Sequence, residues 1–425
     1  MADHGPSAGR RICIVSPGNL ASNPRVVKEA GALQDAGYDV TAVVCNYSPE
    51  LKPADDEIAA RVAWRVVHVP RPLGEGALTR LARQAARIWA SVGGSVPPWL
   101  AAYAAGGPIS TLRRAAGAVP ADLYIAHYIA GLAAAAPVAR ARGALLAFDA
   151  EDFHSGEGTS GPDDAFRMKM ISTIERAALA SCVYVTAAAP LIAGAYAATY
   201  GVSATSVLNV FPFDMAPAAP SSAAASGGPP RLAAYWFSQT IGMDRGLQQF
   251  VEAMALAKCR VTLDVRGGNR WGGGDRLMAV ARDLGIGDRV TILEKAPPDQ
   301  MVTLSAPYDI GLSLEMGETE SRRFCLPNKI FTYLLAGVPV VLSDTPAQRA
   351  LALDLGAAAV VVPLADPAAI AAALDRLGSS PAALAEAKAA AWRLGRDRYN
   401  WDAEKDVLLG VVARAFDRSA GSTIR

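Results

Sequence analysis

The sequence predicts an α/β protein made of two doubly wound halves, each with a buried parallel sheet. Short apolar runs typical of buried strands alternate with helical, often alanine-rich stretches along most of the chain. A tract rich in Pro, Ser, Ala and Gly at residues 212–230 interrupts this alternation, as an interdomain linker would. The chain has 425 residues, which is too long for a single hydrophobic core.

The first half opens with an apolar strand at residues 12–15 and a turn at Gly18. Ser22 or Asn23 is expected to cap a helix that starts at Pro24, because proline at a first helical position loses no hydrogen bond. Further apolar runs predict strands at residues 40–45, 62–69, 123–126, 145–148, 183–186 and 206–208.

A second alternating series follows the linker and defines the predicted domains. Its strands are expected at residues 232–236, 261–265, 290–293, 310–314, 338–342 and 359–362. The pattern divides the chain into a first domain (1–212), a linker (213–230), a second domain (231–398) and an amphipathic C-terminal helix (399–425).

Composition excludes several classes of protein. The chain carries 41 basic and 40 acidic residues, so nothing points to a nucleic-acid partner. Its five cysteines are scattered without a C-x-x-C pair, which fits free thiols in a cytoplasmic protein better than disulfides or a zinc site. No apolar segment follows the basic N-terminal residues, and the longest apolar run, residues 128–139, is too short to cross a bilayer. We expect a cytoplasmic protein, at most attached to the inner membrane face.

The most informative segment is the predicted helix that begins at Pro327. Its first turn holds Asn328 and Lys329, and a Gly-Val-Pro break separates it from the next strand. A helix start presents free N–H groups and the positive end of the helix dipole, which suits a diphosphate. An ordinary capped helix of an α/β unit explains the same pattern.

Four segments carry a resemblance to a known family. The one at residues 327–340 reads Pro-Asn-Lys-Ile-Phe-Thr-Tyr and ends in Gly-Val-Pro-Val, and the others lie at residues 22–30, 149–154 and 237–246. Together they resemble GT-B glycosyltransferases, specifically retaining family four (glycosyl transferases group 1). The resemblance implies two Rossmann-like domains facing a cleft, and a C-terminal helix that packs back toward the first domain. It also implies transfer of a sugar from a nucleoside diphosphate, such as a UDP-sugar, with no cofactor and no metal.

The resemblance assigns the diphosphate to Arg245 and Lys329. Arg245 precedes a glycine where relatives place the lysine of a Lys-Gly pair, and its guanidinium suits phosphate oxygens. Relatives often carry a second arginine about five residues earlier, where this chain has Thr240. Ser238, Gln239 and Thr240 are expected to supply hydroxyl and amide donors instead. A surface charge at a helix start is the alternative for Arg245.

The carboxylate pair of family four is missing. Its two positions fall on Phe324 and Thr332, and Thr332 is expected to hydrogen-bond a ribose hydroxyl. Glu315, Glu318 and Glu320 lie in the preceding loop, and one of them is expected to serve the donor sugar, with Glu318 and Glu320 as the predicted donor contacts. A solvated acidic loop is the alternative. Gly18, Gly267 and Asn328 complete the predicted donor contacts.

In the first half, His127 occupies the place of the active-site histidine of relatives, although histidines at strand ends are often structural. Glu151 replaces the imidazole of the family's Asp-Ala-His segment, and it can orient the acceptor or act as base. Asn19, Asp152 and His154 are predicted acceptor contacts. Two alternatives stay open: Asp149 and Asp152 cap a helix, or the Asp-x-Glu-Asp run binds a metal.

The predicted function is therefore transfer of a sugar to a polysaccharide, a lipid-linked sugar or a small metabolite. A non-hydrolysing sugar-nucleotide epimerase and a degenerate GT-B binding protein remain alternatives, whereas a dinucleotide-dependent oxidoreductase lacks its glycine fingerprint. Arg80, Arg83 and Arg87 share one face of a predicted helix, which favours either a solvated face or contact with a membrane surface.

Overall fold

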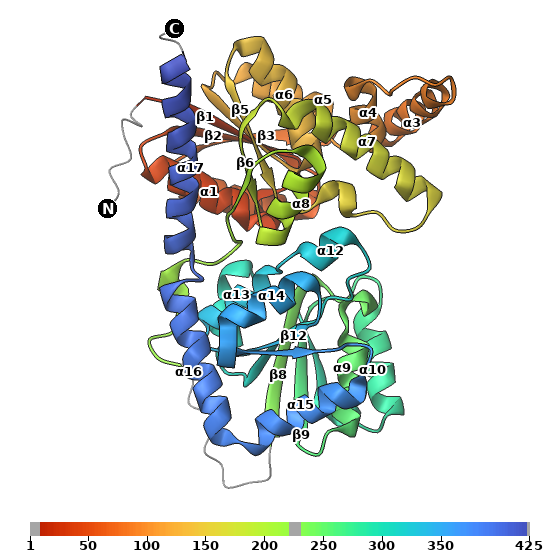
Figure 1. Cartoon of the computed structure of the whole chain (residues 1–425), viewed down its shortest axis with the longest axis vertical. Coiled ribbons are helices and arrows are strands. Elements are labelled where there is room, and N and C mark those ends of the chain that lie inside the picture. The colour runs from red at the N-terminus through yellow and green to blue at the C-terminus, as the bar shows by residue number, and fades with distance from the viewer. Residues whose placement is uncertain (1–8, 221–230, 423–425) are drawn as a thin grey trace. The chain divides into compact units, whose positions relative to one another are not determined.

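The structure, a computed structural model, describes residues 9–220 and 231–422 (Figure 1). Most of the predicted linker and the N-terminal residues 1–8 lie outside the described residues. The chain forms two compact units. The first comprises Met1–Val207, Thr319–Ser321 and Lys405–Arg425, and the second comprises Leu208–Glu318 and Arg322–Glu404.

The first unit is built on a parallel sheet of seven strands in the order β3-β2-β1-β4-β5-β6-β7. Their bounds are β1 Arg11–Ser16, β2 Asp39–Asn46, β3 Arg65–Pro70, β4 Leu123–His127, β5 Leu145–Ala150, β6 Cys182–Ala187 and β7 Ala204–Ser206. The chain winds outward from β1 in one direction and then from β4 in the other. The carboxyl ends of β1 and β4 therefore form the switch point, where ligands of such sheets bind.

Helices cover both faces of this sheet, with α1 and α8 on one side and α5 and α6 on the other (Figure 1). The bounds are α1 Pro24–Asp35, α2 Lys52–Arg61, α3 Glu75–Ser91, α4 Pro98–Ala105, α5 Ile109–Ala118, α6 Tyr128–Arg142, α7 Pro162–Leu179 and α8 Pro190–Tyr200. Asn23, rather than Ser22, caps α1: its side-chain oxygen accepts from the backbone N–H groups of Arg25 and Val26. The last part of α17 (Trp401–Ser422) belongs to this unit, where Phe416 stacks on Tyr38.

The second unit has a parallel sheet of six strands in the order β10-β9-β8-β11-β12-β13. The strands are β8 Arg231–Thr240, β9 Arg260–Gly268, β10 Val290–Leu293, β11 Ile310–Ser313, β12 Val340–Ser343 and β13 Ala359–Val362. The helices are α9 Leu247–Leu256, α10 Gly273–Asp283, α11 Met301–Ser305, α12 Glu320–Phe324, α13 Asn328–Leu335, α14 Pro346–Leu355, α15 Pro367–Ser379 and α16 Pro381–Asp397. The direction of winding reverses between β8 and β11, which makes their carboxyl ends the second switch point.

Two parallel sheets with helices on their faces confirm the predicted α/β fold of two doubly wound halves. Two predicted strands start later than expected. The run at residues 62–69 begins pairing at Arg65, after α2 has ended at Arg61. The run at 338–342 begins at Val340, because Gly337 adopts a left-handed φ of 74° and Pro339 has no N–H to donate to a ladder.

The five cysteines are free, as predicted. Burial raises the pKa of Cys13 and of Cys182 to about 12, so both thiols stay protonated at neutral pH. Within the described residues, no helix has the combination of length and apolar character that crossing a bilayer requires.

Tyr333 holds α13 in place on the second sheet. Its hydroxyl donates to the carbonyl oxygen of Tyr235 in β8 at 3.0 Å, and its ring lies over Gly311 in β11. A Cβ atom at Gly311 would come within 2.3 Å of that ring, so only glycine fits there.

Replacing Gly311 by alanine is therefore expected to destabilise the second unit. Overpacking a filled core costs roughly 1–3 kcal/mol, and the displaced ring would shift the helix that starts at Asn328. Urea unfolding of the variant and the parent measures the loss. Gly285→Ala is a poor comparison because Gly285 has a left-handed φ, whereas Gly31→Ala in α1 meets no atom within 4 Å and is the matched control. Equal unfolding midpoints for Gly311→Ala and Gly31→Ala would contradict the packing argument.

Candidate functional site

A buried carboxylate joins two arginines at the switch point of the second unit. Glu315 follows β11 and is only 2% exposed. Its Oε2 accepts from Arg322 Nη1 at 2.9 Å and from Arg245 Nη1 at 3.4 Å. Asp244 adds weaker ion pairs to both guanidinium groups. Burial lowers the pKa of Arg322, but Glu315 and Asp244 outweigh it, so the pKa is raised on balance.

Arg322 was not predicted as a site residue from the sequence. Thr240 occupies the position, about five residues before Arg245, where relatives often carry a second arginine. The structure supplies a second guanidinium beside Arg245 from α12, the short helix that precedes α13. The only signal in the sequence is the pair of arginines at 322 and 323, seven and eight residues after Glu315.

Lys329 lies in the first turn of α13 and is 5% exposed. Its ammonium group sits 4.6 Å from the centre of the Trp236 ring in β8. It forms no ion pair with any residue that the structure describes, because Glu315 is already shared by the two arginines. Burial is the main cause that lowers the pKa of Lys329 to about 8, with Arg245 acting in the same direction and Glu315 opposing it. A buried cation without a carboxylate partner is suited to an anionic ligand.

The other predicted donor residues lie around these cations. Asn328 begins α13, and the hydroxyl of the buried Thr332 donates to the Asn328 carbonyl oxygen at 3.1 Å. Ser238, Gln239 and Thr240 end β8. Gly267 lies in β9, where a Cβ atom would come within 2.9 Å of the carbonyl oxygen of Ser238, so close approach of the two strands explains this glycine.

Glu318 and Glu320 are exposed and form no ion pair within the described part of the chain. Glu318 belongs to the second unit. Glu320 is the first residue of α12 and lies within Thr319–Ser321, the short segment that is grouped with the first unit. Of the three acidic residues in this loop, Glu315 is the one that the structure joins to the cations.

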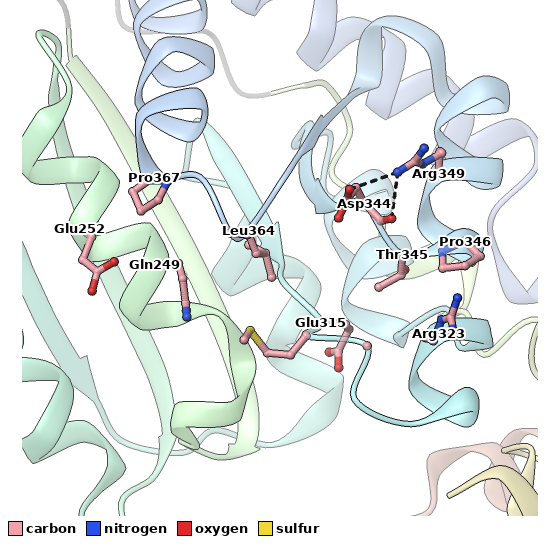
Figure 2. Close-up of a pocket in the computed structure, with 13 residues that line it drawn as sticks. Gln249, Glu252, Glu315, Arg323, Asp344, Thr345, Pro346, Arg349, Leu364 and Pro367 are labelled. Carbon is pink, nitrogen blue, oxygen red and sulfur yellow. Dashed lines mark hydrogen bonds and ion pairs between the residues drawn. The ribbon is translucent and has the colours of Figure 1, made fainter. Parts of the chain in front are cut away.

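A cavity of about 920 Å³ lies at the carboxyl ends of β11, β12 and β13 (Figure 2). Glu315 is part of its wall, and the ion pair between Asp344 and Arg349, at 3.1 Å, forms another part. The remaining lining residues are Gln249, Glu252, Met316, Gly317, Arg323, Thr345, Pro346, Leu364, Ala365 and Pro367. Its volume is in the range of small-molecule sites, and it opens at the edge of the sheet where ligands bind.

In the first unit, Gly18 and Asn19 follow β1. Asn19 is buried, and both ends of its amide are engaged: Nδ2 donates to Asp55 at 2.9 Å and Oδ1 accepts from the backbone N–H of Ser48 at 2.8 Å. These bonds hold the loop together. A Cβ atom at Gly18 would meet nothing closer than the Ser22 hydroxyl at 3.7 Å, so packing does not require glycine there.

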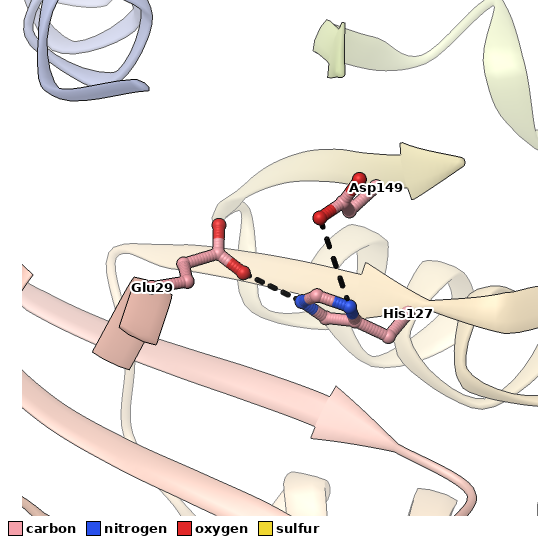
Figure 3. Close-up of side chains that lie close together, drawn as sticks. All are labelled: Glu29, His127 and Asp149. Atoms are coloured by element: carbon pink, nitrogen blue, oxygen red, sulfur yellow. Dashed lines mark hydrogen bonds and ion pairs between the residues drawn. The ribbon is translucent and has the colours of Figure 1, made fainter. Parts of the chain in front are cut away.

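His127 ends β4 at the switch point and is completely buried (Figure 3). Its Nε2 lies 2.6 Å from Glu29, and its Nδ1 lies 3.0 Å from Glu151 and 3.8 Å from Asp149. Burial lowers the pKa of His127, but the surrounding carboxylates outweigh it and raise the pKa to about 10. His127 is therefore an imidazolium at neutral pH, with both ring nitrogens bound to acidic residues.

Arg25 balances this acidic cluster. Its guanidinium binds both oxygens of Asp149, at 2.6 and 2.9 Å, and donates to the carbonyl oxygen of Val207 at 2.7 Å. Glu29, His127 and Asp149 bring one ligand atom each within 4.8 Å of one another, as a metal site would. A metal ion fits poorly there. Both carboxylate oxygens of Asp149 already accept hydrogen bonds from Arg25, and the imidazole of His127 is protonated.

Glu151 receives three hydrogen bonds at the edge of this cluster. Asn23 Nδ2 donates to it at 2.7 Å, and His127 and the hydroxyl of Tyr128 each lie 3.0 Å away. Burial raises the pKa of Glu151, but the bond from His127 and its charge prevail, so the pKa is lowered and the carboxylate is charged at neutral pH. Tyr128 has a φ of 56°, which is rare for a residue with a side chain and marks the turn from β4 into α6 as strained.

His154 and Asp152 follow β5. His154 is 4% exposed, its Nδ1 lies 2.7 Å from Glu157, and its Nε2 has no hydrogen-bond partner among the described residues. Burial lowers the pKa of His154, but Glu157 raises it to about 9 on balance. The alternative that Asp149 and Asp152 cap a helix is wrong, because the short 3₁₀ helix after β5 starts at His154 with Phe153 at its cap position.

The pKa of His127 predicts how the stability of the first unit changes with pH. Its folded pKa, about 10, lies above the ordinary value near 6.5. The stabilisation is therefore complete below about pH 6.5 and is lost as the pH rises through 10. Melting curves from pH 7 to 10 are expected to show a falling midpoint for the parent and a flatter, lower one for His127→Gln. Parallel curves for the two proteins would contradict a charged His127.

Comparisons with known proteins agree with this architecture. Residues 236–380 match the family described as Glycosyl transferases group 1. No curated protein matches the chain. Among solved structures, Anabaena HepE, crystallised with UDP-glucose, superposes with a TM-score of 0.68 at 14% identity, over 95% of this chain and 99% of that one. Sucrose-phosphate synthase from Thermosynechococcus elongatus gives a TM-score of 0.67 at 15% identity, over 96% and 100%. A glycosyltransferase from Rickettsia africae gives 0.65 at 11%, over 97% and 99%.

These structural matches establish the fold along nearly the whole chain, and the family match covers most of the second unit. The chain has the GT-B fold, and its residues 236–380 match the family of glycosyl transferases group 1.

Proposed function

We propose that the chain transfers a sugar from a nucleoside diphosphate donor whose diphosphate binds at the switch point of the second unit. The observation that carries this proposal is Lys329, a buried ammonium group without an ion-pair partner among the described residues, in the first turn of α13. Arg245 and Arg322 lie nearby around Glu315. UDP-glucose is the ligand of the similar HepE structure, which supports a UDP-sugar as donor.

These cations explain what the site contributes to the reaction. When the bond to the sugar breaks, negative charge grows on the departing diphosphate, and fixed positive groups stabilise that charge. Three basic side chains and the N–H groups at the start of α13 can provide this stabilisation without a metal. A metal-independent and retaining reaction is accordingly part of the proposal; retention is carried over from the family resemblance.

The acceptor side of the reaction is assigned to the first unit. We propose that Glu151 orients or activates the acceptor hydroxyl, since its carboxylate is charged and held by three donors. His127 positions Glu151 through its Nδ1. Asp152 and His154 lie in the same segment after β5 and are proposed as further acceptor contacts.

One observation favours a second candidate, a GT-B domain that binds a nucleotide sugar without transferring it. The hydroxyl of Thr332, in the place of the family's ribose-binding carboxylate, is bonded to its own helix. Donor binding without turnover on any acceptor would support this candidate.

A thermal-shift screen with UDP, UMP and uridine tests the proposed donor site. A ligand that binds only the folded protein stabilises it and so raises its melting temperature. The stabilisation is about 2.7 kcal/mol when the ligand concentration is a hundred times the dissociation constant. UDP is expected to give the largest shift and uridine the smallest, because the diphosphate supplies the contacts with the cations. Equal shifts for UDP and uridine would show that the base, and not the diphosphate, is what the protein holds.

A further inference from the structure

An exposed tryptophan lies at the ligand-binding edge of the second sheet. Trp271 follows the carboxyl end of β9, in the loop between Gly268 and Gly273, where α10 begins. Its side chain is 67% exposed. Tryptophan is the largest apolar side chain, and it contributes strongly to binding where a ligand covers it. Its place at the edge of the sheet where ligands bind therefore calls for an explanation.

The backbone of this loop is held in place by side chains of the loop and of α10. Asn269 Oδ1 accepts from the backbone N–H of Gly274 at 2.7 Å, and Asn269 Nδ2 donates to Asp275 at 3.0 Å. The carbonyl oxygen of Trp271 itself accepts from Arg276 Nη1 at 2.9 Å. The loop thus presents the exposed ring from a fixed backbone, and a group fixed in advance loses little entropy when a ligand binds.

The loop of Trp271 packs directly on the segment that leads to Arg245. The backbone N–H of Ile241 donates to the carbonyl oxygen of Gly268 at 3.0 Å. A Cβ atom at Gly273 would clash with the carbonyl oxygen of Ile241, so α10 starts against this segment. The 3₁₀ turn that ends at Arg245 follows at once and also contacts α10. Trp271 and the proposed diphosphate cation Arg245 therefore lie on neighbouring, touching loops.

The chemistry of the two sides of the switch point indicates which end of the donor each side takes. A nucleotide sugar carries its nucleoside on one side of the diphosphate and its sugar on the other. The switch point lies between β8 and β11, with β9 on one side and the cavity at β11–β13 on the other. The described residues that line the cavity include Glu252, Glu315 and Asp344 but no aromatic side chain. Carboxylates accept hydrogen bonds from sugar hydroxyls, whereas a base needs a flat apolar surface. The base thus fits the β9 side, where Trp271 is.

We propose that the nucleobase of the donor stacks on the ring of Trp271. This inference rests on the proposed function, because it takes a nucleotide to bind at this edge of the sheet. Aromatic side chains stack on any base, since every base has a π-face. Trp271 therefore adds affinity for the nucleoside without choosing between uracil and the other bases.

A protein partner fits this ring less well. Interfaces between proteins are built around clusters of apolar side chains. Of the described residues 260–290, the one other large apolar side chain that is exposed is Leu284, past the opposite end of α10. Trp271 thus stands without an apolar patch from its own strand, loop and helix, as a platform for a single flat ring does.

Isothermal titration with UDP and with inorganic pyrophosphate tests the inference. Trp271→Ala is expected to bind UDP about five- to a hundredfold more weakly than the parent, because one stack between a base and an aromatic ring is lost. Its affinity for pyrophosphate is expected to equal that of the parent, because pyrophosphate has no base. Trp271→Phe keeps an aromatic ring and is expected to recover most of the UDP affinity.

Trp99→Ala is the matched control, since Trp99 is 63% exposed and belongs to the first unit. It is expected to bind UDP as the parent does. Equal UDP affinities of Trp271→Ala and the parent would overturn the inference. An equal loss for UDP and pyrophosphate would also overturn it, because the substitution would then act through the loop and not through the base. In sedimentation velocity, a dimer that Trp271→Ala alone disrupts would assign the ring to a second copy instead.

Lys329→Met separates this inference from the proposed donor site, because it is expected to weaken the binding of both UDP and pyrophosphate. If Lys329→Met binds both ligands as the parent does while Trp271→Ala loses UDP affinity alone, the diphosphate is misplaced and the stacking role of Trp271 is retained. If Lys329→Met weakens both and Trp271→Ala weakens neither, the donor site is retained and the stacking role fails. A parent that binds neither ligand would overturn both proposals.

Discussion

Replacing Lys329 by methionine is expected to weaken UDP binding by roughly ten- to a hundredfold. Hydrogen bonds to a charged group contribute about 1.5–3 kcal/mol, and each 1.4 kcal/mol corresponds to a tenfold change in affinity. Methionine keeps most of the volume beside Trp236 while removing the ammonium group, so the core around α13 is retained. Isothermal titration with UDP measures the loss.

Arg260→Met is the control for this experiment. Arg260 begins β9, at the end of the sheet opposite the switch point, and pairs with Asp288 on the surface. It is expected to leave UDP affinity unchanged. Equal affinities of Lys329→Met and the parent would show that the diphosphate lies elsewhere.

The lowered pKa of Lys329 gives the same prediction a pH dependence. The ammonium form binds the diphosphate, and in the free protein it loses its proton as the pH rises through about 8. UDP affinity is therefore expected to fall between pH 7 and 9 in the parent. It should stay flat in Lys329→Arg, because a guanidinium remains charged throughout this range.

Replacing Arg25 by methionine is expected to have the largest effect on stability. Arg25 is 3% exposed, and its loss leaves Asp149 and the Val207 carbonyl buried without their partner. Removing one member of a buried ion pair costs about 3–5 kcal/mol. For a domain of this size each kcal/mol lowers the melting temperature by about 2–4 °C, so a drop on the order of ten degrees is expected in calorimetry.

Arg61→Met provides the matched comparison in the same unit. Arg61 forms an exposed ion pair with Glu57 on the surface of α2, and such pairs contribute at most about 1 kcal/mol. A melting temperature for Arg25→Met close to that of Arg61→Met would contradict the assigned role of the buried network.

The sequence predicted the elements of the fold because their signals are local. The strand at 123–126 is a continuous apolar run, and the structure buries every residue of β4. Asn23 and Pro24 indicate the start of α1, and Pro327 indicates the start of α13. Lys329 was likewise predicted in the first turn of its helix, and the structure places it there.

The ionic partners could not be predicted in the same way, because they depend on which strand ends meet. Arg25 and Asp149 are 124 positions apart, and Glu29 and His127 are 98 apart. The sequence placed His127 at a strand end but gave no sign that carboxylates would engage both ring nitrogens. Arg322 was missed for a similar reason: it lies in the short helix α12, and its pairing with Glu315 depends on how the chain folds back after β11, which no periodicity describes.

A crystal structure of the protein with UDP tests the proposed donor site most directly. We expect the diphosphate within hydrogen-bonding distance of Lys329 and Arg245, against the first N–H groups of α13. A diphosphate bound away from both side chains, with Lys329 still facing Trp236 alone, would contradict it.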